Sequence, residues 1–145
     1  MPILFLTGYE KETIEEFLSK IIKAKIDLIV DVREIPLSRK NGFSKQHLQK
    51  LLESNGVSYL HYPKLGSPSV IRKELYKNGD YVKFFSEYRK YANENAHEIQ
   101  SVLDSIEKWK HPAIMCYEKF CELCHRSIIA SELLKLNNNL RVIPI

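Results

Sequence analysis

Short apolar runs alternate along the chain with longer segments in which apolar residues recur at helical spacing. The apolar runs predict strands over residues 2–7, 26–32, 57–61, 112–117 and 140–145. The segments between them predict helices over about 14–22, 44–55, 81–91, 99–106 and 127–136. Thr13 and Glu16 have the spacing of a capping box before the first helix, and Gly56 is placed to end the second.

This order of elements predicts an α/β fold, namely a single three-layer domain with a mostly parallel sheet of about five strands and helices on both faces. The length of 145 residues suits one domain, and no repeat or low-complexity linker divides the chain. The segment at about 63–90 is too long for an ordinary connection, so we expect a basic, irregular insertion there.

Composition narrows the class of protein. The chain is 44% hydrophobic and 28% charged, which excludes a disordered protein. No run approaches the roughly 18 apolar residues of a membrane span, and acidic Glu10 and Glu12 come too early for a secretory signal. We therefore expect a cytoplasmic protein without a membrane partner, whose three cysteines stay reduced.

The net charge of +4 is unevenly distributed along the chain. Residues 33–63 carry five basic and two acidic side chains, and residues 64–90 carry seven basic and three acidic ones. The two flanking parts are mildly acidic. A positive middle region indicates an anionic partner, which is either a small molecule or a nucleic acid.

In the second of these stretches the basic residues interleave with aromatic ones, a pattern typical of proteins that bind single-stranded nucleic acids. Phe84, Phe85 and Tyr88 have the spacing of the buried face of a helix, so we expect them in the core. Tyr76 and Tyr81 are expected to be exposed, and only such exposed rings remain available to a nucleic acid.

Chemically reactive side chains gather where the predicted strands end. In open parallel sheets, ligands bind beyond the carboxyl ends of the strands, so these side chains are expected to form one composite pocket. The candidates are Thr7, Asp31, Arg33, Ser38, Arg39, Tyr59, Cys116, Glu118, Cys124, His125 and Arg126.

The segment 116–127 carries the most specific chemistry. A thiol at Cys124 would lie at the amino terminus of a helix, where the helix dipole and unpaired N–H groups favour the thiolate. Arg126 adds a permanent positive charge, and His125 is suited to moving a proton. These residues predict either an activated cysteine or an anion pocket, with Glu118 orienting His125 or Arg126. A capped helix with a purely structural Glu118–Arg126 ion pair is the plainer alternative.

Metal binding is the less favoured interpretation of the same segment. Cys116, Cys121, Cys124 and His125 offer four ligands that suit zinc. Adjacent residues on a helix point about 100° apart, so Cys124 and His125 would diverge. We expect no metal ion, and no motif indicates a cofactor.

Asp31 and Arg33 lie at the end of the second predicted strand. Alternation sends both side chains to the same side, where they either pair with each other or present their charge to the pocket. Ser38 and Arg39 follow Pro36 in a loop that is suited to contacting an anion.

The chain resembles an uncharacterised family, domain of unknown function 488. Two blocks carry the resemblance, Asp31-Val-Arg33-x-x-Pro36-x-Ser38-Arg39 and Cys116-x-Glu118 followed by Cys124-His125-Arg126. The family pattern also includes Leu6-Thr7-Gly8-Tyr9, Phe43, Tyr59 and Leu65-Gly66. The resemblance spans nearly the whole chain and implies an α/β domain in which the residues of the two blocks share one site, without an established reaction.

A second, weaker similarity is to rhodanese-type sulfurtransferases. These enzymes carry a strand that ends in Asp-Val-Arg and an active loop in which a cysteine precedes Arg-Ser. Cys121-x4-Arg126-Ser127 has the length of that loop. The similarity implies Cys121 as the nucleophile, whereas the helix dipole favours Cys124, and both assignments remain open.

The sequence thus favours a cysteine-dependent transferase or hydrolase that acts on an anionic substrate containing phosphate or sulfur. The expected catalytic residues are Cys124, His125 and Glu118. The expected anion-binding residues are Arg126, Arg33, Arg39, Ser38 and Thr7, supported by Asp31, Cys116 and Tyr59. The alternatives are a nucleic-acid-binding or accessory module that uses the basic region 33–90, and a sensor of small anions without chemistry.

Overall fold

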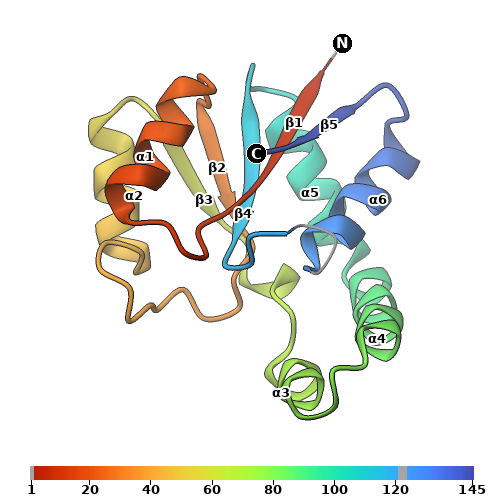
Figure 1. Cartoon of the computed structure of the whole chain (residues 1–145). Helices are drawn as coiled ribbons and strands as arrows, with labels where there is room; N and C mark the ends of the chain where they lie inside the picture. The colour runs from red at the N-terminus through yellow and green to blue at the C-terminus, as the bar shows by residue number, and fades with distance from the viewer. Residues whose placement is uncertain (1, 121–123) are drawn as a thin grey trace.

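The computed structural model describes residues 2–120 and 124–145. Its strands are β1 (Ile3–Gly8), β2 (Leu28–Asp31), β3 (Ser58–His61), β4 (Pro112–Cys116) and β5 (Arg141–Pro144). All five run parallel in one sheet with the order β3-β2-β4-β1-β5, so that β4 lies at the centre (Figure 1).

The helices cover both faces of the sheet, which confirms the predicted fold class. They are α1 (Ile14–Lys23), α2 (Lys45–Ser54), the short 3-10 helix η1 (Pro63–Leu65), α3 (Ser69–Asn78), α4 (Tyr81–Glu94), α5 (Ala96–Ile106) and α6 (Arg126–Leu136). The predicted capping box between Thr13 and Glu16 is formed at the start of α1. None of the helices in the described part of the chain is long and apolar enough to cross a membrane.

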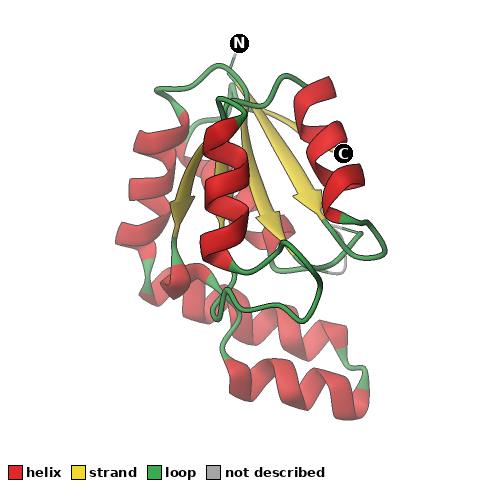
Figure 2. Cartoon of the chain, turned by 90° about the vertical axis from the view of Figure 1, so that its left-hand side faces the viewer, coloured by secondary structure: helices red, strands yellow, loops and turns green. Residues whose placement is uncertain are grey.

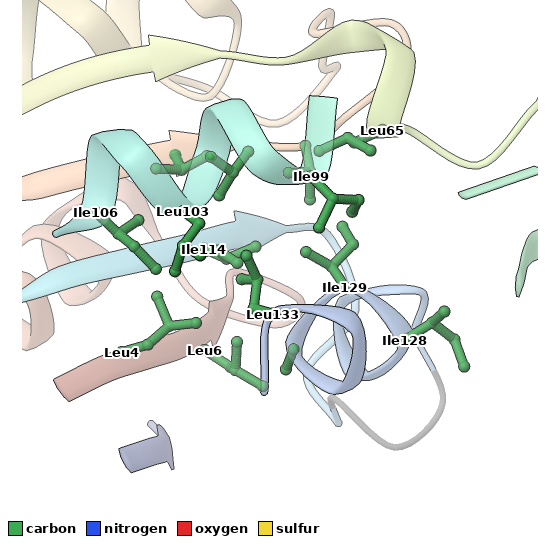
Figure 3. Packing of buried hydrophobic residues seen from close by; sticks show 14 of the residues in the cluster. Leu4, Leu6, Leu65, Ile99, Leu103, Ile106, Ile114, Ile128, Ile129 and Leu133 are labelled. Carbon is green, nitrogen blue, oxygen red and sulfur yellow. The ribbon is translucent and has the colours of Figure 1, made fainter. Parts of the chain in front are cut away.

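Each face of the sheet packs into its own hydrophobic core. One core lies under α1 and α2 and includes Phe17, Ile21, Leu48, Leu52 and Met115. The other lies under α5 and α6, and Figure 3 shows among its members Leu4, Leu6, Ile99, Leu103, Ile106, Ile114, Ile129 and Leu133. Along β2 the side chains alternate, since Ile29 belongs to the first core and Leu28 and Val30 to the second. Burial on both sides is why the inner strands β1, β2 and β4 are nearly continuous apolar runs in the sequence.

The segment 63–90 is largely helical, so the expectation of an irregular insertion is wrong. Here η1 is followed by α3 and the start of α4, and α3 and α4 form a pair beyond the carboxyl ends of the strands (Figures 1 and 2). Leu75 is the only buried residue of α3, so this helix has no apolar stripe that periodicity could reveal. Phe84 and Tyr88 of α4 are buried as predicted, whereas Tyr76 is 70% exposed.

Gly8 ends β1 at a point where two other segments pass very close. A Cβ atom at this position would overlap the carbonyl oxygen of Glu118 and lie 2.5 Å from Nη1 of Arg126. Glu118 belongs to the loop after β4, and Arg126 is the first residue of α6. A residue without a side chain is therefore required for β1, this loop and α6 to meet.

We predict that Gly8→Ala lowers the free energy of unfolding by on the order of 3 kcal/mol, because the backbone must move to admit the methyl group. Gly56→Ala is the control, since its φ of +76° disfavours a side chain but no atom lies within 4 Å of the added carbon. Its expected loss is about 1 to 2 kcal/mol. Urea unfolding measures both variants, and equal losses would contradict the steric requirement at Gly8.

Candidate functional site

A pocket of about 370 Å³ lies beyond the carboxyl ends of β2 and β4. The chain leaves β2 toward α2 on one face of the sheet and leaves β4 toward α6 on the other face, so the two loops part and leave a crevice. The pocket is lined by Tyr9, Arg33, Glu34, Ile35, Leu37, Ser38, Arg39, Ser67, Arg72, Tyr76, Cys116, Tyr117, Glu118 and His125.

Most of the predicted site residues are brought together here. Those that line the pocket are Arg33, Ser38, Arg39, Cys116, Glu118 and His125. Behind this wall, Cys124 and Arg126 lie next to Cys116. Asp31 contacts Arg33, and Tyr59 contacts Asp31 in turn. The described residues of the two sequence blocks therefore meet at one end of the sheet.

Two predicted residues lie elsewhere or cannot be placed. Thr7 is buried outside the pocket wall, and its carbonyl oxygen accepts a hydrogen bond from Nη1 of Arg126 at 2.6 Å. Thr7 thus positions Arg126 through its backbone, and the expectation that it lines an anion pocket is wrong. Cys121 lies outside the described residues, so its assignment as a nucleophile stays a prediction.

Arg33 is held by a buried ion pair at the end of β2. Its Nε lies 2.9 Å from Oδ1 of Asp31, and its Nη2 lies 2.8 Å from Oδ2. Its Nη1 donates to the hydroxyl oxygen of Tyr9 at 3.1 Å and to the carbonyl oxygen of Phe43 at 2.6 Å. These bonds use four of the five guanidinium N–H groups, so of the two arrangements that the sequence left open, Arg33 pairs with Asp31.

Two further residues fix this ion pair. The hydroxyl of Tyr59 donates to Oδ2 of Asp31 at 2.5 Å, and burial together with this carboxylate raises the pKa of Tyr59, which keeps it a neutral donor. Nε2 of His61 lies 2.8 Å from the carbonyl oxygen of Arg33. Burial opposes the charge of Arg33, but Asp31 outweighs it and raises the pKa of Arg33. The cation is therefore permanent and part of the framework.

Cys124 and His125 form a thiol–imidazole pair just before α6. Sγ of Cys124 lies 3.5 Å from Nδ1 of His125. The other ring nitrogen, Nε2, lies 2.9 Å from the carbonyl oxygen of Val32. A carbonyl oxygen only accepts, so Nε2 carries a proton and the lone pair of Nδ1 in the neutral ring faces the thiol. In this arrangement the thiol can pass its proton to the imidazole.

The surroundings favour the charged form of this pair. Burial opposes ionisation of Cys124, but the hydrogen bond from Cys116 and the charges of His125 and Arg126 hold the pKa of the Cys124 thiol well below its usual value. Burial also lowers the pKa of His125, yet the thiolate and the carbonyl oxygen of Val32 bring it above its usual value. The backbone N–H of Arg126 lies 3.5 Å from Sγ of Cys124 at the positive end of α6. These effects together favour a thiolate–imidazolium pair.

Cys116 and Glu118 line the pocket next to this pair. Sγ of Cys116 lies 3.1 Å from Oε2 of Glu118 and 3.4 Å from Nη1 of Arg126. Burial and the contact with Cys124 raise the pKa of the Cys116 thiol, and burial and the charge of Cys124 raise the pKa of Glu118. Cys116 therefore keeps its proton, and Glu118 takes up a proton more readily than an exposed carboxylate does.

The same cluster is the group of described residues that could hold a metal ion. The ligand atoms of Cys116, Cys124 and His125 all lie within 4.8 Å of one another. The expectation that Cys124 and His125 diverge is wrong, because α6 begins only at Arg126 and neither residue lies inside the helix. The guanidinium of Arg126 lies against Sγ of Cys116 and would repel a metal cation there, which disfavours metal binding by the cluster.

Two more arginines lie on the side of the pocket that faces solvent. Arg39 is exposed and forms no hydrogen bond or ion pair with any residue of 2–120 or 124–145. Arg72 of α3 pairs with Glu34 at 3.4 Å and donates to the carbonyl oxygen of Ser67 at 2.5 Å. Both terminal nitrogens of Arg72 are thus used within the protein, by Ser67, Ser69 and Glu34, so Arg39 has more donors available to a ligand.

Several pocket residues are not predicted from the sequence, namely Tyr9, Glu34, Ile35, Leu37, Ser67, Arg72, Tyr76 and Tyr117. Tyr9 did have a signal, because it ends the block Leu6-Thr7-Gly8-Tyr9. Its ring stacks on Phe43, another residue of the family pattern, with 4.2 Å between the ring centroids. Arg72 and Tyr76 come from α3, which periodicity does not reveal, so their only signal is their place in the basic segment.

Ion pairs within the protein neutralise part of the positive charge of the basic segment 64–90. Nζ of Lys83 lies 2.5 Å from a carboxylate oxygen of Glu74, and Nη1 of Arg89 lies 3.0 Å from one of Glu132. The aromatic rings of this segment that belong to the core are likewise unavailable to a ligand. These contacts reduce the charge and the number of rings that the segment can offer to a ligand.

Asp31→Asn is predicted to lower the free energy of unfolding by about 3 to 5 kcal/mol, because it leaves the buried guanidinium of Arg33 without its counter-charge. Tyr59→Phe is the control, since it removes only one hydrogen bond to the same carboxylate, with an expected cost of about 1.5 kcal/mol. Denaturant unfolding measures both variants. If they lose the same stability, the ion pair is not what holds the end of β2.

A family model matches most of the chain. It is described as Domain of unknown function DUF488 and matches residues 13–133. Searches of curated proteins and of solved structures found no match. The matched range runs from the N-cap residue of α1 into the last turns of α6 and includes both blocks of pocket residues. Because the match covers well over half of the sequence, the chain belongs to the DUF488 family.

Proposed function

We propose that this protein is an enzyme that uses the thiolate of Cys124 on a small anionic substrate bound in the pocket. The observation that carries the proposal is the position of His125, whose Nδ1 lies 3.5 Å from Sγ of Cys124 while Nε2 lies 2.9 Å from the carbonyl oxygen of Val32. Arg126 adds a second positive charge beside the thiol. The thiolate is the reactive form of cysteine in nucleophilic catalysis, and these surroundings stabilise it.

In the proposed reaction, the proton moves between Cys124, His125 and the substrate. Cys124 attacks an electrophilic atom of the substrate, and the imidazolium of His125 returns its proton to the leaving group. Glu118, whose pKa is raised by burial and by Cys124, is the second group that can donate a proton. The reaction is a transfer when a second substrate takes up the bound group, and a hydrolysis when water does so.

The position of Cys124 limits the size of the reacting group. Its side chain is only 1% exposed, and Cys116, Glu118 and His125 form the pocket wall beside it. A substrate must reach Sγ past Cys116. We therefore propose a compact anionic group that contains phosphorus or sulfur, such as a phosphoryl group or a small sulfur oxyanion.

The charge around the pocket supports an anionic substrate. The donors of Arg33 are largely used by Asp31, Tyr9 and Phe43, and Asp31 balances its charge, so we assign to this residue a role in shaping the pocket. Arg39 has no partner among residues 2–120 and 124–145 and is exposed at the pocket. We assign the direct contact with the anion to Arg39.

The ultraviolet absorbance of the thiolate is predicted to appear at a pH below the value of about 8.5 at which a free cysteine ionises. The pKa of Cys124 is lowered, so its thiolate is present above that lowered value and disappears as the pH falls through it. His125→Asn is expected to move this midpoint back toward the value of free cysteine, because it removes the proton acceptor. Spectroscopic titration of the full chain measures the midpoint.

Matched cysteine variants assign the titration to one thiol. Cys124→Ser should abolish the low midpoint, whereas Cys116→Ser keeps a hydroxyl donor beside Cys124 and should retain it. A low midpoint that survives in Cys124→Ser would contradict the proposal. Metal analysis of protein purified without chelator belongs to the same experiment, and one equivalent of zinc would also contradict it, since the three ligands would then serve the metal.

Inorganic phosphate is predicted to bind in the pocket, and Arg39→Gln to weaken this binding about tenfold, as the loss of one charge-assisted hydrogen bond of roughly 1.5 kcal/mol implies. Arg141→Gln, which removes an exposed arginine of β5 outside the pocket, is the control and should bind as tightly as the natural chain. Calorimetric titration at low ionic strength measures the dissociation constants. Equal affinity in all three proteins would remove the assignment of Arg39.

A further inference from the structure

Cys116 and Cys124 hold two free thiols close together inside the protein. Cys116 is the last residue of β4, Cys124 precedes α6, and each is 1% exposed. Their sulfur atoms belong to the group of ligand atoms that lie within 4.8 Å of one another. A disulfide has an S–S length of about 2.05 Å, so the two sulfurs need to approach by less than about 3 Å to be joined.

The two thiols differ in access and in surroundings. Cys116 lines the pocket of about 370 Å³ and lies 3.1 Å from Oε2 of Glu118. Cys124 is not part of the pocket wall and contacts His125 and the backbone N–H of Arg126. A small molecule that enters the pocket therefore meets Cys116 first, with the sulfur of Cys124 behind it.

We propose that Cys116 and Cys124 form a reversible disulfide when a small hydroperoxide enters the pocket, and that this oxidation switches the site off. The inference rests on the proposed function in one respect, because it takes the attacking thiolate to be that of Cys124. It assigns to Cys116 a role of its own, as the sulfur that receives the oxidant.

The reaction balances in two steps. The proton of the Cys116 thiol passes to Glu118, the sulfur attacks the distal peroxide oxygen, and the O–O bond breaks as an S–O bond forms. The departing alkoxide takes the proton from Glu118 and leaves as an alcohol, which for hydrogen peroxide is water. The thiolate of Cys124 then attacks the sulfenic acid of Cys116, and the released hydroxide takes the proton of His125 and leaves as water. Two thiols are oxidised and one hydroperoxide is reduced.

The disulfide inactivates the site by using up both sulfurs. It removes the thiolate on which the proposed reaction depends, and it removes the S–H group that faces Glu118. A dithiol reductant reverses the change, since thiol–disulfide exchange returns both cysteines to the reduced form.

To test this, the reduced full chain is treated with hydrogen peroxide, and the remaining thiols are blocked with N-ethylmaleimide before mass spectrometry. The expected product lacks two hydrogen atoms, and dithiothreitol restores the original mass. Trypsin cuts after Lys110, Lys119 and Arg126, so the linked peptides are 111–119 and 120–126. The second peptide also contains Cys121, and Cys121→Ser is therefore the deciding variant, which should still form the link.

Two more variants separate the steps. Cys124→Ser should stop at the sulfenic acid of Cys116, which dimedone traps, and Cys116→Ser should form no link. A link that is lost in Cys121→Ser would overturn the inference. So would a natural chain that keeps its thiols under conditions that fully oxidise glutathione.

The disulfide and the thiolate are tested by different measurements. Mass spectrometry detects the link between Cys116 and Cys124, whereas ultraviolet absorbance detects the charge of Cys124. A low thiolate midpoint without any link overturns the redox inference alone. A link that forms in a protein whose thiols titrate normally overturns the proposed function and leaves the redox site in place.

Discussion

The guanidinium group of Arg126 is fully buried where β1, β4 and α6 meet. A buried cation needs acceptors around it, and Nη1 lies 2.6 Å from the carbonyl oxygen of Thr7 and 3.4 Å from Sγ of Cys116. These contacts leave no room for a side chain at Gly8 and hold Cys116 beside Cys124. The same charge helps to stabilise the thiolate of Cys124. One buried side chain therefore contributes to both the geometry and the electrostatics of the site.

The inner strands β1, β2 and β4 and the reactive residues at their ends could be predicted because these strands are largely buried on both faces and thus appear as apolar runs. Most of the residues that form the site could be identified from two sequence blocks, which run from Asp31 to Arg39 and from Cys116 to Arg126. The helix α3 could not be predicted, since it buries only Leu75. The contact between Cys124 and His125 could not be predicted either, because it depends on both residues lying before the first residue of α6 and not inside the helix, which spacing along the chain does not encode.

The arginines of the site divide into two kinds for a physical reason. Arg33 and Arg126 are buried, and a buried guanidinium must direct its N–H groups to acceptors of the protein. Their direct contacts are therefore with the protein, and they position the residues around the pocket. Arg39 is exposed, so its donors face solvent and need no acceptor from the protein. Sequence spacing places all three near the strand ends and does not distinguish between these roles.

β4 lies at the centre of the sheet although it is the fourth strand in the sequence. Its two neighbours, β1 and β2, are made early, and neither can find its central partner before residues 112–116 have left the ribosome. Until then β2 can pair only with β3, so the sheet cannot close before residues 112–116 have been made. The first cysteine of the sequence is Cys116, the last residue of that central strand. Within residues 1–145, the chain therefore carries no thiol before the central strand of the sheet has been made.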